Sequence, residues 1–226
     1  MNLIKKSIIA TSLILLFIQT AASQEGMGGM GMAAQTPVDD GINRVEITLV
    51  DPLDDRRGWC VDLFGHLTNG ILLGGLQGHN CFLYMGRGVT EDQGFDADRF
   101  ADTGELQLVY YDKCMTLYER NSGSFVSVED CNGEDIQNFV MSEVGEIKPK
   151  AQTDLCLTLG DLSIPGGGRL APEGTRPPES NKEIHQIRRL TFTTCSESIA
   201  GLQRWEFRSN YAEQELTQPH RFYKGE

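Results

Sequence analysis

Two short motifs occur three times along the chain, always in the same order and with one further cysteine between them. Each unit opens with a cysteine at the start of a short apolar stretch and closes with a Gln-x-aromatic tripeptide. The openings are Cys60-Val-Asp-Leu, Cys114-Met-Thr-Leu and Cys156-Leu-Thr-Leu. The closings are Gln93-Gly-Phe95, Gln137-Asn-Phe139 and Gln203-Arg-Trp205. This regularity indicates an internal repeat.

The cysteines between the motifs are Cys81, Cys131 and Cys195, one in each unit. Six cysteines can pair in many ways, but the repeat favours one bond inside each unit. The expected disulfides are Cys60–Cys81, Cys114–Cys131 and Cys156–Cys195. No two cysteines have the short spacing typical of zinc sites. We therefore expect disulfides and predict neither a metal site nor a cofactor.

Residues 1–23 have the pattern of a signal peptide. Lys5 and Lys6 precede an apolar run from Ile8 to Ile18, and Ala21-Ala-Ser23 offers small residues for cleavage. The run is shorter than the roughly 20 residues that a membrane span needs. We expect an exported protein, secreted or periplasmic, without membrane insertion, in a compartment where disulfides persist.

The charge balance is acidic, with 20 Lys and Arg against 32 Asp and Glu, for a net charge of −12. Nucleic-acid binding depends on neutralising phosphates with Lys and Arg, so nucleic acid is not an expected partner. The acidity does not by itself identify any other partner.

The pattern of the rest of the chain predicts one all-β domain over residues 42–212. Apolar and polar residues alternate in several short runs, and turn residues such as Asn69-Gly70 separate them. The runs include Val45–Val50, Leu106–Tyr110, Phe125–Val128 and Leu190–Thr193. Residues 24–41, rich in Gly and Met, are expected to be a flexible lead, and residues 213–226 a C-terminal tail.

The third unit contains a long insertion, approximately residues 164–183, with the sequences Pro-Gly-Gly-Gly and Arg-Pro-Pro. Proline and glycine disfavour regular structure, so we expect an exposed loop here. Protruding loops on rigid scaffolds commonly carry recognition. The insertion therefore supports an alternative function, in which the protein is a non-catalytic scaffold that binds a protein partner.

These motifs resemble those of the ricin B-type lectin domains, over approximately residues 55–210. The resemblance rests on the opening Cys-hydrophobic-Asp/Thr, the inner cysteine and the Gln-x-aromatic, three times in register. It implies a single β-trefoil of three repeats with one disulfide in each. It also implies an exported carbohydrate-binding protein whose partner is a glycan or glycoconjugate.

The Gln-x-aromatic motifs are expected to have a structural role. The rings of Phe95, Phe139 and Trp205 should fill the interior where the repeats meet, which buries a large apolar area. A glutamine side chain has both donors and acceptors, so it can satisfy backbone groups where strands cross.

Sugar binding in this family uses an Asp in the opening strand, an aromatic residue at the end of the second strand, and a polar residue before the glutamine. Only the first unit supplies all three, as Asp62, Tyr84 and Asp92. We take residues 80–84 as its second strand. The remaining predicted contacts come from its neighbours Gln93, His79 and Asn80. The second and third units have Thr116 with Ile136, and Thr158 with Leu202.

Other interpretations of these residues stay open. Asp62 could cap a turn, Tyr84 could belong to the core, and two neighbouring carboxylates would favour a cation-assisted or basic ligand. Catalytic signatures such as Gly-x-Ser-x-Gly and His-Glu-x-x-His are absent from the sequence. We therefore do not expect an enzyme, although paired acids of a glycan-acting enzyme are an alternative.

Overall fold

The computed structural model describes residues 40–65, 75–83, 88–166 and 186–209. The expected signal peptide, nearly all of the Gly/Met-rich lead, and the C-terminal tail lie outside these residues. Tyr84 and most of the third-repeat insertion also lie outside them. Among the described residues, no helix combines the length and apolar character that crossing a membrane requires.

The described residues form twelve strands, four in each repeat. In the first repeat they are β1 (Arg44–Leu49), β2 (Trp59–Leu63), β3 (Leu76–Asn80) and β4 (Phe95–Asp96). In the second they are β5 (Gln107–Leu108), β6 (Lys113–Leu117), β7 (Ser124–Asp130) and β8 (Phe139–Met141). In the third they are β9 (Ile147–Pro149), β10 (Leu155–Pro165), β11 (Gln186–Thr194) and β12 (Trp205–Arg208).

The strand pairing repeats with the sequence. The second and third strands of every repeat form an antiparallel hairpin, β2–β3, β6–β7 and β10–β11. The fourth strand of each repeat pairs with the first strand of the next, β4–β5 and β8–β9, and β12 returns to pair with β1. This last pairing closes the ring of repeats, so the chain has the all-β trefoil architecture that the sequence predicted.

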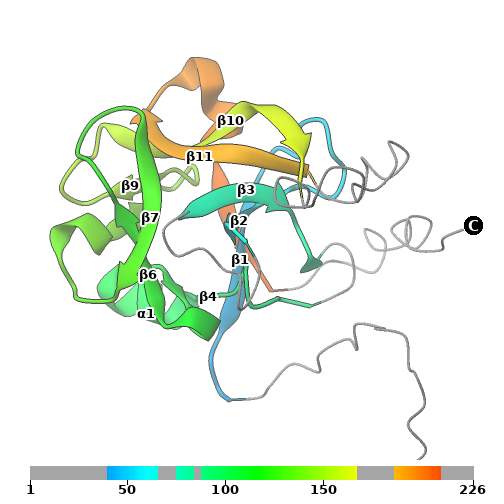
Figure 1. Ribbon diagram of the computed structural model, residues 1–226. Coiled ribbons are helices and arrows are strands. Elements are labelled where there is room, and N and C mark those ends of the chain that lie inside the picture. Colours follow the sequence, from blue (N-terminus) through cyan, green and yellow to red (C-terminus); the bar gives the residue numbers. More distant parts are fainter. Residues whose placement is uncertain (1–39, 66–74, 84–87, 167–185, 210–226) are drawn as a thin grey trace, which may run out of the picture. The chain divides into compact units, whose positions relative to one another are not determined.

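The three hairpins meet at one end of the ring. Strand β11 pairs with β10 along one edge. Along its other edge, Ile187–Arg189 pair with β3, and Thr191 and Phe192 pair with β7 (Figure 1). All three disulfides are formed as expected, Cys60–Cys81, Cys114–Cys131 and Cys156–Cys195, each with a Cα–Cα distance of 5.0 Å. Each disulfide joins the opening strand of a hairpin to the end of its partner strand.

The rings of the closing motifs lie in the common core. Phe95, Phe139 and Trp205 are each 0 to 1 % exposed. Phe139 stacks on Phe192 of β11 with 5.5 Å between ring centroids, and Trp205 Nε1 donates to the Leu157 carbonyl at 2.9 Å. The prediction that these rings have a structural role agrees with their burial at the centre of the three repeats.

A short helix interrupts the β structure where the sequence pattern indicated only turns. Helix α1 (Ala97–Thr103) begins after Asp96, whose side chain accepts from the backbone N–H groups of Asp98 and Arg99, and ends at Gly104 with φ +84°. This is an ordinary N-cap and a glycine C-cap. Three 3-10 segments complete the described elements: η4 (Val109–Tyr111), η5 (Asp135–Gln137) and η7 (Glu197–Leu202).

Two expected boundaries were wrong. The second strand of the first repeat is Leu76–Asn80 and not residues 80–84, because its register with β2 ends where the disulfide at Cys81 joins the two strands. Strand β10 also continues into the expected insertion, since Ile164 pairs with Ile187 and Pro165 with Gln186. The insertion beyond Gly166 lies outside the described residues.

Candidate functional site

The glutamine of each closing motif bridges the two residues that flank the inner cysteine. Its Nε2 donates to the carbonyl before that cysteine, and its Oε1 accepts from the N–H after it. The carbonyls belong to Asn80, Asp130 and Thr194, at 3.1, 2.9 and 3.2 Å. The N–H groups belong to Phe82, Asn132 and Ser196, each at 2.9 Å. The glutamines thus satisfy backbone groups that the strand ladders leave open.

Each glutamine also donates to the side chain two residues after the opening cysteine. In the second and third repeats this partner is a hydroxyl: Gln137 donates to Thr116 Oγ1 at 3.0 Å, and Gln203 to Thr158 Oγ1 at 2.9 Å. In the first repeat Gln93 donates to a carboxylate oxygen, Asp62 Oδ2, at 3.0 Å. The bridge itself therefore requires only a hydroxyl at this position.

The other oxygen of Asp62 accepts from Gln77 Nε2 at 2.9 Å, and Gln77 is the cross-strand partner of Asp62 in the β2–β3 hairpin. Asp62 is only 2 % exposed. Burial raises its pKa well above the usual value and the nearby Asp92 carboxylate raises it further, while the bonds from Gln77 and Gln93 act in the opposite direction. Asp62 is therefore an internally bonded acid in a poorly solvated position.

Asp92, just before the glutamine, is 3 % exposed. Its Oδ1 accepts from the hydroxyl of Tyr111, a residue of η4 in the second repeat. Its backbone carbonyl accepts from the N–H of Leu63 at 2.9 Å, at the end of β2. The carboxylates of Asp62 and Asp92 thus lie close together, as the sequence suggested, with donors from two repeats around them.

His79 and Asn80 lie at the end of β3, beside the disulfide. His79 pairs across the hairpin with Cys60, is 7 % exposed, and has its Nδ1 2.7 Å from the Asn80 carbonyl. The Asn80 Oδ1 accepts from the Gln186 N–H at 2.7 Å, which links β3 to the start of β11. His79 is the penultimate residue of β3, and Tyr84, the aromatic residue predicted for the end of this strand, lies outside the described residues.

Two residues of this cluster, Gln77 and Tyr111, were not found from the sequence. Gln77 is fixed opposite Asp62 by the hairpin register, which could not be inferred because the connection between the two strands is long. Tyr111 reaches Asp92 from the next repeat, across 19 positions of sequence. The sequence around Gln77 and Tyr111 contains no motif that would mark either residue as part of the site.

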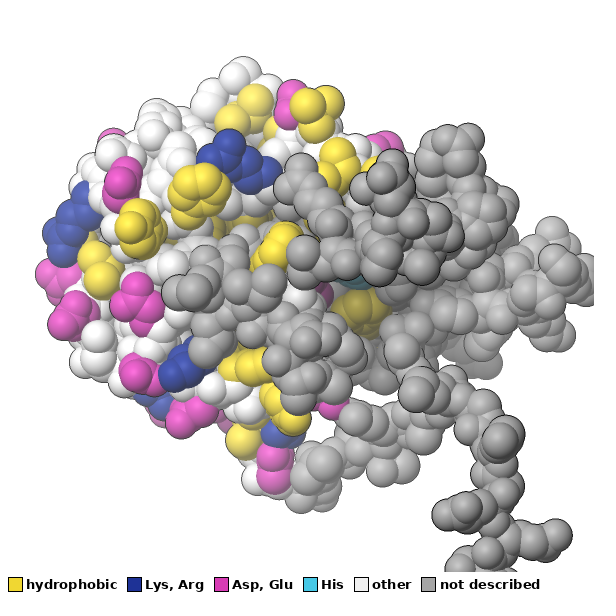
Figure 2. Space-filling view, viewed as in Figure 1, with side chains coloured by type: hydrophobic (Ala, Val, Ile, Leu, Met, Phe, Trp, Pro, Cys, Tyr) yellow, Lys and Arg dark blue, Asp and Glu magenta, His cyan; other side chains and the backbone are white. Residues whose placement is uncertain are grey.

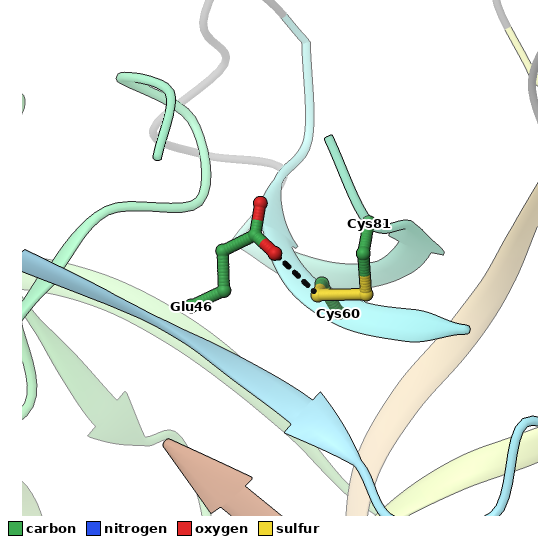
Figure 3. A group of neighbouring side chains, drawn as sticks. All are labelled: Glu46, Cys60 and Cys81. Carbon is green, nitrogen blue, oxygen red and sulfur yellow. Dashed lines mark hydrogen bonds between the residues drawn. A yellow bond between two sulfur atoms is a disulfide. The ribbon is translucent and has the colours of Figure 1, made fainter. Parts of the chain in front are cut away.

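A third buried acid of the first repeat, Glu46 of β1, also went unnoticed in the sequence. Figure 3 shows its carboxyl group directed at the Cys60–Cys81 disulfide, with Oε2 3.4 Å from Cys60 Sγ. Its Oε1 accepts from the Leu83 N–H at 2.7 Å. Burial raises the pKa of Glu46 to about 8, and the charge of Asp62 adds to this. A disulfide sulfur has no proton to donate, so the short contact fits a protonated Glu46 that donates to the sulfur.

The cluster of Glu46 with Cys60 and Cys81 has the spacing of a metal site, and so does that of Glu146 with Cys156 and Cys195. Metal binding by cysteine needs thiolates. In both clusters the sulfurs are bonded to each other, at 2.07 and 2.04 Å. These two groups are therefore disulfides with a neighbouring carboxyl group, and their donor sets do not fit a metal ion.

No protein-family model and no curated protein matches the chain. Among solved structures it is similar to the agglutinin from Abrus precatorius, with 16 % identity and a TM-score of 0.43, over 74 % of this chain and 46 % of that one. The chain thus spans about half the length of the agglutinin. It is also similar to the β-trefoil lectin of the Vibrio vulnificus hemolysin/cytolysin with N-acetyl-D-lactosamine bound, at 17 % identity and TM-score 0.44, over 76 % and 98 %. The mdaA-1 domain aligns at 14 % identity and TM-score 0.46, over 74 % and 89 %.

The class of the protein follows from the repeat itself. Three hairpins, three internal disulfides and three glutamine bridges, arranged around one ring of strands, define a β-trefoil fold. The disulfides indicate folding in an oxidising compartment.

Proposed function

We propose that this protein is an exported, non-enzymatic carbohydrate-binding protein with one sugar site, in the first repeat. The site consists of the carboxylates of Asp62 and Asp92 with the neighbouring donors Gln77 and His79 and the Gln93 bridge. Export would follow from removal of residues 1–23, and the mature chain would begin at Gln24.

The observation that carries the proposal is the carboxylate of Asp62 at a position where the scaffold needs only a hydroxyl. Thr116 and Thr158 accept the same glutamine bond in the other repeats. A buried acid with a raised pKa costs stability relative to threonine. A function that requires a carboxylate explains why the first repeat carries this cost.

A carboxylate can accept two sugar hydroxyls through charge-assisted bonds, which are the stronger kind. Each oxygen of Asp62 accepts one hydrogen bond from a glutamine and has capacity for a second. Because Asp62 is nearly sealed from solvent, a sugar hydroxyl would compete with Gln77 for it. The net gain per bond is then small, and we expect weak binding at this single site.

The first test is a glycan array, followed by calorimetry on the strongest ligand with the variant Asp62→Thr. Threonine keeps an acceptor for Gln93, as in the other two repeats, so the variant should fold. Loss of the carboxylate should weaken binding at least about tenfold, a loss of about 1.4 kcal/mol. Thr116→Ser, which keeps the hydroxyl in the second repeat, is the matched control and should bind like the wild type.

A blank array, or an Asp62→Thr variant with unchanged affinity, would show that the first repeat is not the sugar site. The scaffold alternative predicted from the sequence places a protein partner on residues 164–183. Of these, only Ile164, Pro165 and Gly166 are described.

A further inference from the structure

A second group of side chains lies on the outer surface where the hairpins meet. Tyr118, at the end of β6, is 64 % exposed, and Phe125 of β7 is 57 % exposed. Their backbones are hydrogen-bonded across the hairpin, Tyr118 N–H to Phe125 carbonyl at 3.4 Å. On the other side of Phe125, β7 pairs with β11, and the guanidinium of Arg189 lies over the Phe125 ring, 4.5 Å from its centroid. We call Tyr118, Phe125 and Arg189 the hairpin platform.

Arg189 differs sharply from its neighbour Arg188. Arg188 points inward: it is 6 % exposed, pairs with Asp54 at 2.7 Å, donates to the Gly160 carbonyl at 2.7 Å and lies over the Trp59 ring. Arg189 points outward and is exposed. Among the described residues, its guanidinium stacks on the Phe125 ring and forms no ion pair with a carboxylate. One arginine therefore completes the scaffold, while the hydrogen-bond donors of the other face solvent.

The combination of groups on the platform defines a ligand chemistry. An exposed aromatic face packs against apolar C–H groups, and a guanidinium binds a carboxylate through two parallel hydrogen bonds. Stacking on Phe125 also holds the guanidinium in one plane, which lowers the entropy lost on binding. In Figure 2, Lys and Arg side chains lie beside hydrophobic ones over the region where β7 and β11 run side by side.

The negative net charge of the chain bears on where an anionic ligand can bind. The protein has a net charge of −12, so an anionic ligand is repelled except where a cation stands free of acid partners. Asp161 lies in the bulge of β10, near the start of β11, but no ion pair joins it to Arg189 among the described residues. The platform is thus a local exception on an acidic protein.

We propose that the hairpin platform binds a carboxylate-bearing saccharide. One sugar ring packs on Tyr118 and on the part of the Phe125 ring that the Arg189 guanidinium leaves open, and its carboxylate pairs with that guanidinium. Arg189 is also the cross-strand partner of Gln77 in the β11–β3 pairing, and Gln77 donates to Asp62. The platform therefore adjoins the first-repeat cluster through the paired strands β11 and β3, although its binding does not require that cluster to be a sugar site.

The test is calorimetry with trigalacturonic acid and with the same trisaccharide after reduction of its carboxyl groups to alcohols. The wild type should bind the acidic form at least about tenfold more tightly, because only that form pairs with the guanidinium. Arg189→Gln should abolish the preference, and Phe125→Ala should weaken binding of both forms. Arg204→Gln, which removes a positive charge that already pairs with Glu197 at 2.9 Å, is the matched control and should leave both affinities unchanged.

The variant Asp62→Thr separates this proposal from that of the first-repeat site. If only the platform binds, trigalacturonate affinity should survive Asp62→Thr and fall in Arg189→Gln. Equal affinity of the wild type for the acidic and reduced trisaccharides, no binding of either, or an Arg189→Gln variant that keeps the preference would overturn the platform proposal. Urea unfolding of each variant checks that the fold is intact, which is expected because all three platform residues are at the surface.

Discussion

In the first repeat the bridging glutamine donates to a carboxylate, whereas in the second it donates to a hydroxyl. Gln93 and Gln137 otherwise make the same bonds to the backbone on both sides of the inner cysteine. The hydroxyl of Thr116 is enough to complete the bridge. Asp62 is therefore an addition to the scaffold and not a part that it needs.

The two repeats also differ in the surroundings of a buried glutamate, Glu46 in the first repeat and Glu105 in the second. Glu46 and Glu105 both accept from the N–H two residues beyond the inner cysteine, that of Leu83 and that of Gly133. Glu105 is paired with Arg99 at 2.8 Å. Glu46 is fully buried beside a disulfide, and the charge of Arg208 lowers its pKa only slightly against the effect of burial.

This comparison separates what holds the trefoil together from what makes one repeat different. Rings, disulfides and glutamine bridges recur because each repeat must close its hairpin on the common core. The buried acids whose pKa is raised, Glu46 and Asp62, both lie in the first repeat, and ionising either one costs stability.

The largest effects should come from the rings that all repeats share. Truncating Phe95 or Phe139 to alanine should lower the free energy of unfolding by about 3–5 kcal/mol in each case, since each leaves a cavity in the core. Trp205→Ala should cost at least as much, because it also removes the bond to the Leu157 carbonyl. Urea unfolding with the disulfides intact measures all three. If Phe95→Ala alone cost less than about 1 kcal/mol, the three rings would not contribute equally to the core.

The two buried glutamates should respond to neutralisation with opposite signs. The pKa of Glu46 is about 8 in the folded protein against 4.5 for the free group, so the folded state holds its proton longer. Its stabilising effect is full below pH 4.5 and is lost as the pH rises to 8, by up to about 5 kcal/mol. Glu46→Gln should remove this part of the pH dependence and raise the stability at pH 8 by about 2 kcal/mol.

Glu105→Gln is the matched variant and should lower the stability at pH 7 by about 1–2 kcal/mol, because it removes the charged partner of Arg99, whose side chain stays partly solvated. Chemical unfolding of both variants between pH 4.5 and pH 8 gives the comparison. If both substitutions destabilise the protein equally at every pH, Glu46 is charged in the folded state and the distinction between the repeats is lost.

The smallest effects should come from the hydroxyls under the glutamine bridges. Thr116→Val removes an acceptor from Gln137 Nε2 and should cost about 1–2 kcal/mol. Thr158→Val should cost less, about 0.5 kcal/mol, because Gln203 Nε2 keeps a second hydroxyl acceptor, Thr193 Oγ1, at 3.2 Å. Thermal unfolding of the pair tests this order, and a larger cost for Thr158→Val would show that Thr193 does not substitute.

Much of the scaffold could be predicted from the sequence because its determinants are local. The cysteine pairs, the buried rings and the glutamines each belong to a short motif that recurs three times, so the repeat itself reveals their roles. Helix α1 was missed because a capped helix of seven residues is too short to show a helical period. The strand boundary at Asn80 was misplaced because the disulfide at Cys81, and not the apolar character of the next residues, ends the pairing.

The candidate sites could be predicted only in part. Asp62, Asp92 and Gln93 were found because they stand at fixed offsets from the motifs, and the structure brings them together. Gln77, Tyr111 and the hairpin platform depend on strand register and on contacts between repeats, which no spacing in the sequence reveals.

The sequence by itself determined the three repeats, the disulfide pairs and the residues that differ in the first repeat. Each of these can be read from a short motif, or from its offset within that motif. Tertiary structure alone decided which acids have a cation beside them and which arginine faces solvent. Arg188 and Arg189 are adjacent in the chain, yet the alternation of β11 buries one against Asp54 and exposes the other over Phe125. The surroundings of a charge, and hence its pKa and its availability to a ligand, are set by packing between distant segments.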